Sequence, residues 1–258
     1  MSGDEPGVTG GSDSAGIPFE GRAFHENPAA GDDGAADPRL VEAVRRFRSR
    51  ELGVPEVLAA LGSARLLVPL VTDRGDEGVG PHGQVVDKTQ ELALVTVAGP
   101  DGRSVLPVFS SVDAMRVWNP VARPIPVTAP RAALAAAADG AGAIVLDPGA
   151  PTEFAVRRTA FEALATDARF EPCFTDERVL EAFLAASAGE PSVRAVQLAP
   201  GDPDARLRGP ELLVQLALHA GLDRDGLDAV LARLGEAWAA SPVIVDRVDS
   251  IAVRLESV

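Results

Sequence analysis

Cysteine, lysine and long apolar runs are scarce in this 258-residue chain, which has a single cysteine. One cysteine, Cys173, excludes an internal disulfide bond and a zinc site built from thiolates. Glu171 lies two residues before it and favours a raised thiol pKa, so we expect a buried or unreactive group. No apolar run approaches the roughly 18 residues that a membrane-spanning helix requires. The N-terminus lacks the apolar region of a signal peptide, so we expect a cytoplasmic protein without membrane contact.

Positive charge is also in short supply. The chain has 24 Lys and Arg residues against 38 Asp and Glu, which gives a formal net charge of −14 at pH 7. Nucleic-acid binding needs a basic surface to neutralise phosphates, so this balance argues against DNA or RNA as a partner.

The motifs of common catalytic classes are missing or misplaced. The chain has no G-x-x-x-x-G-K-[ST] phosphate-binding loop and no G-x-S-x-G nucleophile motif. Gly78–Gly83 matches G-x-G-x-x-G, but Pro81 and a following strand replace the helix that would hold a pyrophosphate, so we interpret it as a loop. The three histidines lack the spacing of metal ligands. We therefore predict no catalytic, cofactor-binding or metal-binding residues and no enzyme activity.

The N-terminal segment differs from the rest of the chain. Residues 1–37 carry eight acidic side chains and one basic, Arg22, among many Gly, Ser, Pro and Ala residues. We predict that residues 1–36 form a disordered acidic tail, because such a segment cannot bury enough apolar surface to offset its ordering entropy. An island inside it contains Ile17, Phe19 and Phe24. These residues are either isolated apolar side chains or, with Arg22, a docking motif.

Beyond the tail, helix and strand patterns alternate. Asp37 followed by Pro38 predicts the start of a helix, and Ser110, Thr159 and Thr175 are read as the caps of later helices. Strands are predicted from alternating or short apolar runs. They are Arg65–Val71, Leu92–Val97, Ser104–Phe109, Ile125–Val127, Ala143–Leu146, Phe154–Arg157, Val193–Leu198, Leu212–Leu218 and Ile251–Leu255.

This pattern predicts a mixed α/β (α+β) fold with two small mixed β-sheets, each packed by helices. The two halves share an order of strand, turn, strand, helix ending in Trp, and strand. We assign one domain to residues 37–168 and a second to residues 169–258.

One polar cluster in a loop could bind a ligand or a partner. It contains His82, Asp87 and Lys88, and Lys88 is the only lysine of the chain. The simpler interpretation is an ion pair between Lys88 and a neighbouring acid, since sequence proximity does not supply the geometry of a site.

Several segments resemble the SseB family, named for enhanced serine sensitivity. They include His82–Leu92, the block Val95–Trp118 with its Leu-Pro-Val-Phe-Ser-Ser run, and Ile144–Gly149. The second half resembles the family's C-terminal domain, and Ile17–Asp33 is similar to the tail of the actinobacterial branch. The resemblance implies a cytoplasmic α/β protein of two domains with no established enzyme activity, and it carries over no catalytic residues.

These observations favour a non-catalytic interaction or regulatory protein, with a link to serine or amino-acid metabolism. Its partner would be another protein or a second copy of the chain, on which the tail island could dock. The alternative is a small-ligand-binding protein, or an unrecognised enzyme, with a pocket between the two domains near His82 and Lys88.

Overall fold

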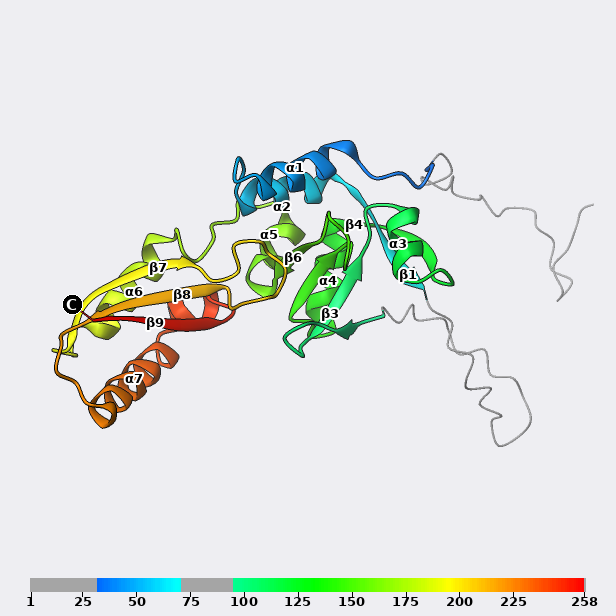
Figure 1. The fold of residues 1–258 in the computed structure, drawn as a ribbon. Coiled ribbons are helices and arrows are strands. Elements are labelled where there is room, and N and C mark those ends of the chain that lie inside the picture. The colour runs from blue at the N-terminus through cyan, green and yellow to red at the C-terminus, as the bar shows by residue number, and fades with distance from the viewer. Residues whose placement is uncertain (1–31, 71–94, 258) are drawn as a thin grey trace, which may run out of the picture. The chain divides into compact units, whose positions relative to one another are not determined.

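The structure is a computed structural model that describes residues 32–70 and 95–257 (Figure 1). From Gly34 onward, these residues belong to one compact unit. The strands are, in chain order, β1 (Arg65–Leu70), β2 (Val97–Ala98), β3 (Ser104–Val108), β4 (Arg123–Thr128), β5 (Ala143–Leu146), β6 (Phe154–Arg157), β7 (Val193–Pro200), β8 (Leu212–Leu218) and β9 (Ile251–Ser257).

The helices lie between these strands. They are α1 (Pro38–Arg48), α2 (Val54–Ser63), α3 (Val112–Trp118), α4 (Ala129–Ala138), the 3-10 turn η1 (Arg158–Ala160), α5 (Phe161–Thr166), α6 (Glu177–Ser187), α7 (Arg224–Ala239) and α8 (Pro242–Arg247). Helix α1 begins as predicted: the side chain of Asp37 accepts a hydrogen bond from the backbone N–H of Arg39, 2.8 Å away.

Four strands form what we call the N-terminal sheet, in the order β2-β3-β5-β6. The β2–β3 pair is antiparallel, β3 and β5 are parallel, and β6 then adds to β5 in the antiparallel direction. Every residue of β5 and β6 is buried, as expected for short apolar strands covered on both faces. Strands β1 and β4 form a separate antiparallel pair, which a single bridge between Leu67 and Phe109 joins to the end of β3.

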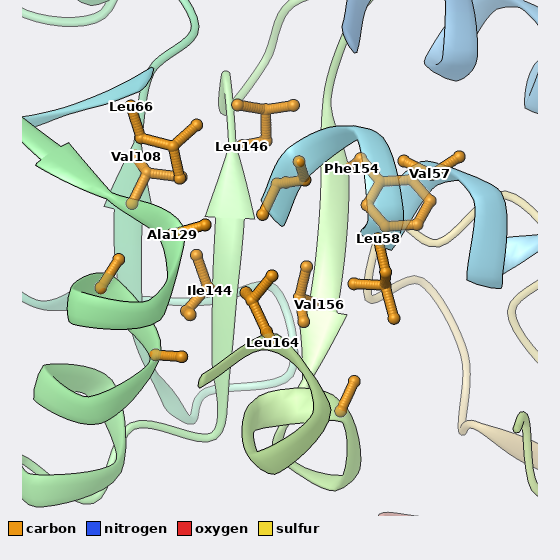
Figure 2. Close-up of a cluster of buried hydrophobic side chains, with 14 of the residues drawn as sticks. Val57, Leu58, Leu66, Val108, Ala129, Ile144, Leu146, Phe154, Val156 and Leu164 are labelled. Carbon is orange, nitrogen blue, oxygen red and sulfur yellow. The ribbon is translucent and has the colours of Figure 1, made fainter. Parts of the chain in front are cut away.

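The main core of this part lies between the N-terminal sheet and its helices. Figure 2 shows Ile144 on β5 and Phe154 on β6 among side chains from α2 and α5, including Leu58 and Leu164. The ring of Phe154 meets that of Phe47 of α1 edge to face, with centroids 5.2 Å apart. The sheet is therefore fixed by helices that come before it and after it in the chain.

The remaining strands form the C-terminal sheet, in the order β7-β8-β9. Strand β8 pairs antiparallel with β7 and parallel with β9. Its alternate residues, Leu212 to Leu218, are buried against α6, α7 and α8 in a second core. In that core the rings of Phe183 and Trp238 lie 5.2 Å apart.

The mixed α/β fold class is confirmed. The predicted plan of the two halves is present in the order of elements along the chain, but the last strand of that plan in the first half, β4, pairs with β1 and not with the N-terminal sheet. Each sheet contains an antiparallel hairpin followed by a parallel strand, although in the first half that parallel strand is β5, the next strand after β4. The strands of the first half also divide into the N-terminal sheet and the β1–β4 pair. The boundary at residues 168 and 169 stays a prediction, and residues 1–31 of the predicted tail lie outside the described residues. The end of the tail is described: the Gly34 carbonyl accepts from the backbone N–H of Val112 at 2.9 Å, and the Ala35 carbonyl accepts from Arg65 at 2.5 Å.

Three predicted helix caps are wrong, each by one position. Ser111, and not Ser110, accepts the hydrogen bond that begins α3, and Asp176, and not Thr175, begins α6. The residue before α5 is Ala160, whose side chain makes no capping bond. Ser110 and Thr159 instead form hydrogen bonds with distant side chains, which are described below.

Candidate functional site

The residues singled out in the sequence lie outside the described part of the chain, so their roles stay predictions. They are His82, Asp87, Lys88, Ile17, Phe19, Arg22 and Phe24. The structure instead shows three other features that bear on function: a buried polar network, a buried aspartate at a strand end, and the outer edge of β9.

The buried polar network consists of Arg103, Arg157, Asp202, Glu211 and Asp249, and it joins the two sheets. Arg157 ends β6, and its side chain is only 9% exposed. Its guanidinium donates to Asp202 at 2.9 Å and to Asp249 at 3.1 Å. Two further bonds reach the Gly209 carbonyl and the Ser250 hydroxyl. A buried cation is tolerable only with such complete pairing, so Arg157 acts as a structural tie.

Asp249 is held by two arginines. Both nitrogens of the Arg103 guanidinium end donate to its carboxylate, at 2.8 and 2.9 Å, and Arg157 adds a third bond. Burial opposes the charged form, but the hydrogen bonds and charges of Arg103 and Arg157 outweigh it and hold the pKa of Asp249 below its ordinary value. The Asp249 carboxylate is therefore ionised, and both of its oxygens already accept hydrogen bonds from arginines.

Asp202 organises the loop 201–209 that packs against β6. One of its oxygens accepts from the backbone N–H groups of Arg206 and Leu207 as well as from Arg157. The loop carbonyl of Ala205 accepts from Ala155 of β6 at 2.7 Å, so the loop covers the outer edge of that strand. A Cβ on Gly209 would lie 2.5 Å from the Gly201 carbonyl oxygen, so this close approach requires glycine.

Glu211 links both sheets through its carboxyl group. It accepts from the Thr159 hydroxyl at 2.9 Å and from the backbone N–H of Asp249 at 2.7 Å. Burial raises the pKa of Glu211, and the nearby Asp249 charge adds to that effect. Cys173 is buried beside it, and burial followed by the Glu211 charge raises the thiol pKa. The predicted burial of Cys173 is confirmed, but burial and Glu211, and not the predicted Glu171, raise its pKa.

A small cleft lies against this network. Its volume is about 50 Å³, and the polar side chains that line it are Arg157, Thr159, Asp202 and Glu211, with Phe170 and Phe174 among the apolar ones. That volume holds about three water molecules. All four polar side chains already have partners within the chain, so the cleft can hold water or a very small polar guest.

A second buried carboxylate, Asp147, lies where the parallel strands β3 and β5 end. Its side chain accepts from the backbone and hydroxyl of Ser110, at 2.8 and 2.7 Å, and from the Thr152 hydroxyl at 2.7 Å. Its φ of +45° is unusual for a residue other than glycine. The three bonds offset that backbone strain and fix the turn after β5. Among the described residues, the Ser110 hydroxyl bonds to this carboxylate and to no histidine.

The outer edge of β9 is the third feature. Ile251, Val253 and Leu255 lie in register with Leu212, Val214 and Leu216 of β8, on the face that carries the core. The three β8 side chains are fully buried, yet their β9 neighbours are 36–40% exposed. Within residues 32–70 and 95–257, β8 is the only strand that pairs with β9.

In the described part of the chain, no group of three or more His, Cys, Asp or Glu side chains could hold a metal ion. None of its helices has the length and apolar character needed to cross a membrane.

The arrangement defines a mixed α/β protein whose buried charges tie its sheets together. Residues 40–163 match the family model described as the SseB protein N-terminal domain. This part of the chain therefore belongs to the SseB family, as its sequence resemblance indicated. No curated protein and no solved structure matches the chain. The resemblance of the second half to the family's C-terminal domain stays a prediction.

Proposed function

We propose that this chain is a non-catalytic, cytoplasmic protein-interaction module. The observation that carries the proposal is the outer edge of β9, which pairs with no strand of residues 32–70 and 95–257 and on which the apolar side chains of the core face are 36–40% exposed. An exposed apolar edge strand is a template for pairing with another chain. The serine-sensitivity phenotype behind the family name suggests amino-acid metabolism as the process.

The state of the polar side chains supports a non-catalytic role. Arg157, Asp249 and Asp202 are committed to one another and to backbone groups. Catalysis requires a nucleophile or acid–base pair aimed at open space. The one cysteine, by contrast, is buried with a raised pKa.

Site-specific photo-cross-linking in living cells tests this proposal. A photo-reactive amino acid replaces Leu255 on β9 or, as the control, Gln197, an exposed residue of β7. We expect a protein adduct from position 255 and none from position 197, since cross-linking reports direct contact. Absence of any adduct at position 255, in cells that express the full chain at its native level, would overturn the proposal.

A second candidate function is binding of a small polar ligand, which the cleft beside Glu211 and Arg157 favours. A guanidinium and a carboxyl group at one cleft are complementary to the two charged ends of glycine, the smallest amino acid. Thermal-shift measurements with glycine and with other polar molecules of similar or smaller size, on the wild type and on Glu211→Gln, test it. A ligand that raises the melting temperature of the wild type alone would support this function, and no shift with any of them would remove it.

A further inference from the structure

The two sheets share a plan up to their third strand and differ beyond it. In each sheet an antiparallel hairpin is followed by a parallel strand, β5 in one and β9 in the other. In the N-terminal sheet an antiparallel fourth strand, β6, covers the far side of β5. The corresponding position beside β9 has no strand in the part of the chain that the structure describes.

The two outer edges of the C-terminal sheet are also built differently. Strand β7 has two features that discourage edge pairing: a shift in register between Val193 and Ala195, and Pro200 at its end. Strand β9 pairs with β8 without a shift over seven residues and contains no proline. Bulges and prolines are among the features by which proteins protect their edge strands. Of the two edges, β9 is therefore the one suited to accept another strand.

The sequence of β9 is complementary to itself in the antiparallel direction. When Leu255 lies opposite Leu255 of a second copy, Arg254 lies opposite Glu256 of that copy, and Glu256 opposite its Arg254. Both charged side chains are exposed and share the face away from the core. Centring the pair on Arg254 would oppose two arginines, and centring it on Val253 would leave both charges without an opposite partner. Opposite charges across two strands stabilise a pair, and like charges destabilise it.

We propose that β9 pairs antiparallel with β9 of a second copy, centred on Leu255, so that two C-terminal sheets join into one six-stranded sheet about a two-fold axis. This inference rests on the proposed function and names its partner. The second copy supplies the antiparallel strand that β6 supplies to the N-terminal sheet. Such a self-complementary edge closes on itself in a dimer, the commonest oligomer of soluble proteins. One strand pair buries less than the roughly 1,600 Å² of a standard interface, so the dimer is concentration-dependent.

Sedimentation velocity of the purified full chain over a range of concentrations tests the pairing. We expect a monomer–dimer equilibrium in the wild type. Leu255→Lys brings two like charges together at the two-fold axis and raises the dissociation constant about tenfold or more. Gln197→Lys adds the same charge to the exposed face of β7 and leaves the dissociation constant unchanged.

Charge reversal tests the register. Arg254→Glu alone and Glu256→Arg alone each place like charges opposite one another and weaken the dimer, whereas the double variant restores it. These exposed positions also keep the test decisive if Leu255→Lys fails to fold, which circular dichroism reveals.

Three results would overturn this inference. They are a wild type that stays monomeric, a dimer indifferent to Leu255→Lys, and single charge reversals without effect. A monomer whose position 255 cross-links to a different protein in cells would remove the self-pairing and leave the proposed function standing. A monomer without any adduct would remove both.

Discussion

Strands β6 and β9 show two ways of treating a sheet edge. Strand β6 covers β5, and its own outer side is covered by the loop 201–209 through the bond between Ala155 and Ala205. Its last residue, Arg157, is tied to Asp249, two residues before β9 begins. Strand β9 is anchored at its start by the polar network, and its Ile251, Val253 and Leu255 side chains are 36–40% exposed. Within the part of the chain that the structure describes, the edge of β6 is thus covered by a loop and the edge of β9 is open.

Removing the buried ion pairs of Arg157, at the end of β6, has the largest expected effect on stability. Arg157→Met leaves the carboxylates of Asp202 and Asp249, which are 5% and 2% exposed, without one of their partners. Removing one member of a buried ion pair costs about 3–5 kcal/mol. We therefore expect the free energy of unfolding, measured by urea denaturation at pH 7, to fall by that amount.

The matched control is Arg45→Met on α1, where the Arg45–Glu42 pair is exposed. We expect no measurable loss there, because solvent screens the pair. Equal losses in the two variants would contradict the tie at Arg157.

Substitution of two neighbouring leucines compares the stability contributions of a covered strand and an open strand of the C-terminal sheet. Leu216 of β8 is fully buried and Leu255 of β9, its register partner, is 40% exposed. Leu216→Ala costs about 2–5 kcal/mol because it opens a cavity. Leu255→Ala costs about 1 kcal/mol or less, since much of its side chain is already in water.

Denaturation at low protein concentration, where the monomer dominates, measures both costs. A loss of stability at Leu255 as large as that at Leu216 would show that β9 is already covered within a single chain.

The pH dependence of stability gives the smallest of these effects. The pKa of Glu211 is raised in the folded state, so its contribution to stability is fully present below the unfolded value of about 4.3. That contribution is lost as the pH rises through the folded pKa. Relative to Glu211→Gln, the wild type therefore loses stability as the pH rises from about 4.

Asp249 affects stability in the opposite direction. Its pKa is lowered in the folded state, so its contribution to the free energy of unfolding is lost as the pH falls. Asp249 is present in both proteins, so comparing them isolates Glu211. Urea denaturation from pH 4 to pH 7 measures the difference, and a difference that does not change with pH would exclude a raised pKa for Glu211.

Most strands were predictable from the sequence because their signals are local. The short apolar run Ala143–Leu146 and the alternation in Leu212–Leu218 have the predicted bounds. The strand predicted at Leu92–Val97 differs in the described residues, where β2 is Val97–Ala98. The N-cap Asp37 is also confirmed, since its side chain bonds to the backbone N–H two residues away. Helix α8 was not predicted, because its six residues are too few to show a helical period.

Two of the three wrong caps, Ser110 and Thr159, have a common physical cause, whereas the Thr175 hydroxyl bonds locally to the Pro172 carbonyl. The Ser110 hydroxyl binds Asp147, and the Thr159 hydroxyl binds Glu211, 52 residues further along the chain. Each hydroxyl thus forms a hydrogen bond with a residue distant in sequence instead of capping the nearby helix. The polar network could not be predicted for the same reason. Arg157 binds acids that are 45 and 92 residues away in the sequence, and no local pattern indicates these contacts.

Hydrogen exchange on the full chain, at low and high protein concentration, tests the contrast between β6 and β9 most directly. We predict that backbone amides of residues 251–257 gain protection as concentration rises, while those of residues 154–157 and 193–200 do not change. That result would place the partner on the open edge alone. Amides of residues 251–257 that exchange at the same rate at every concentration would contradict a dimer through β9.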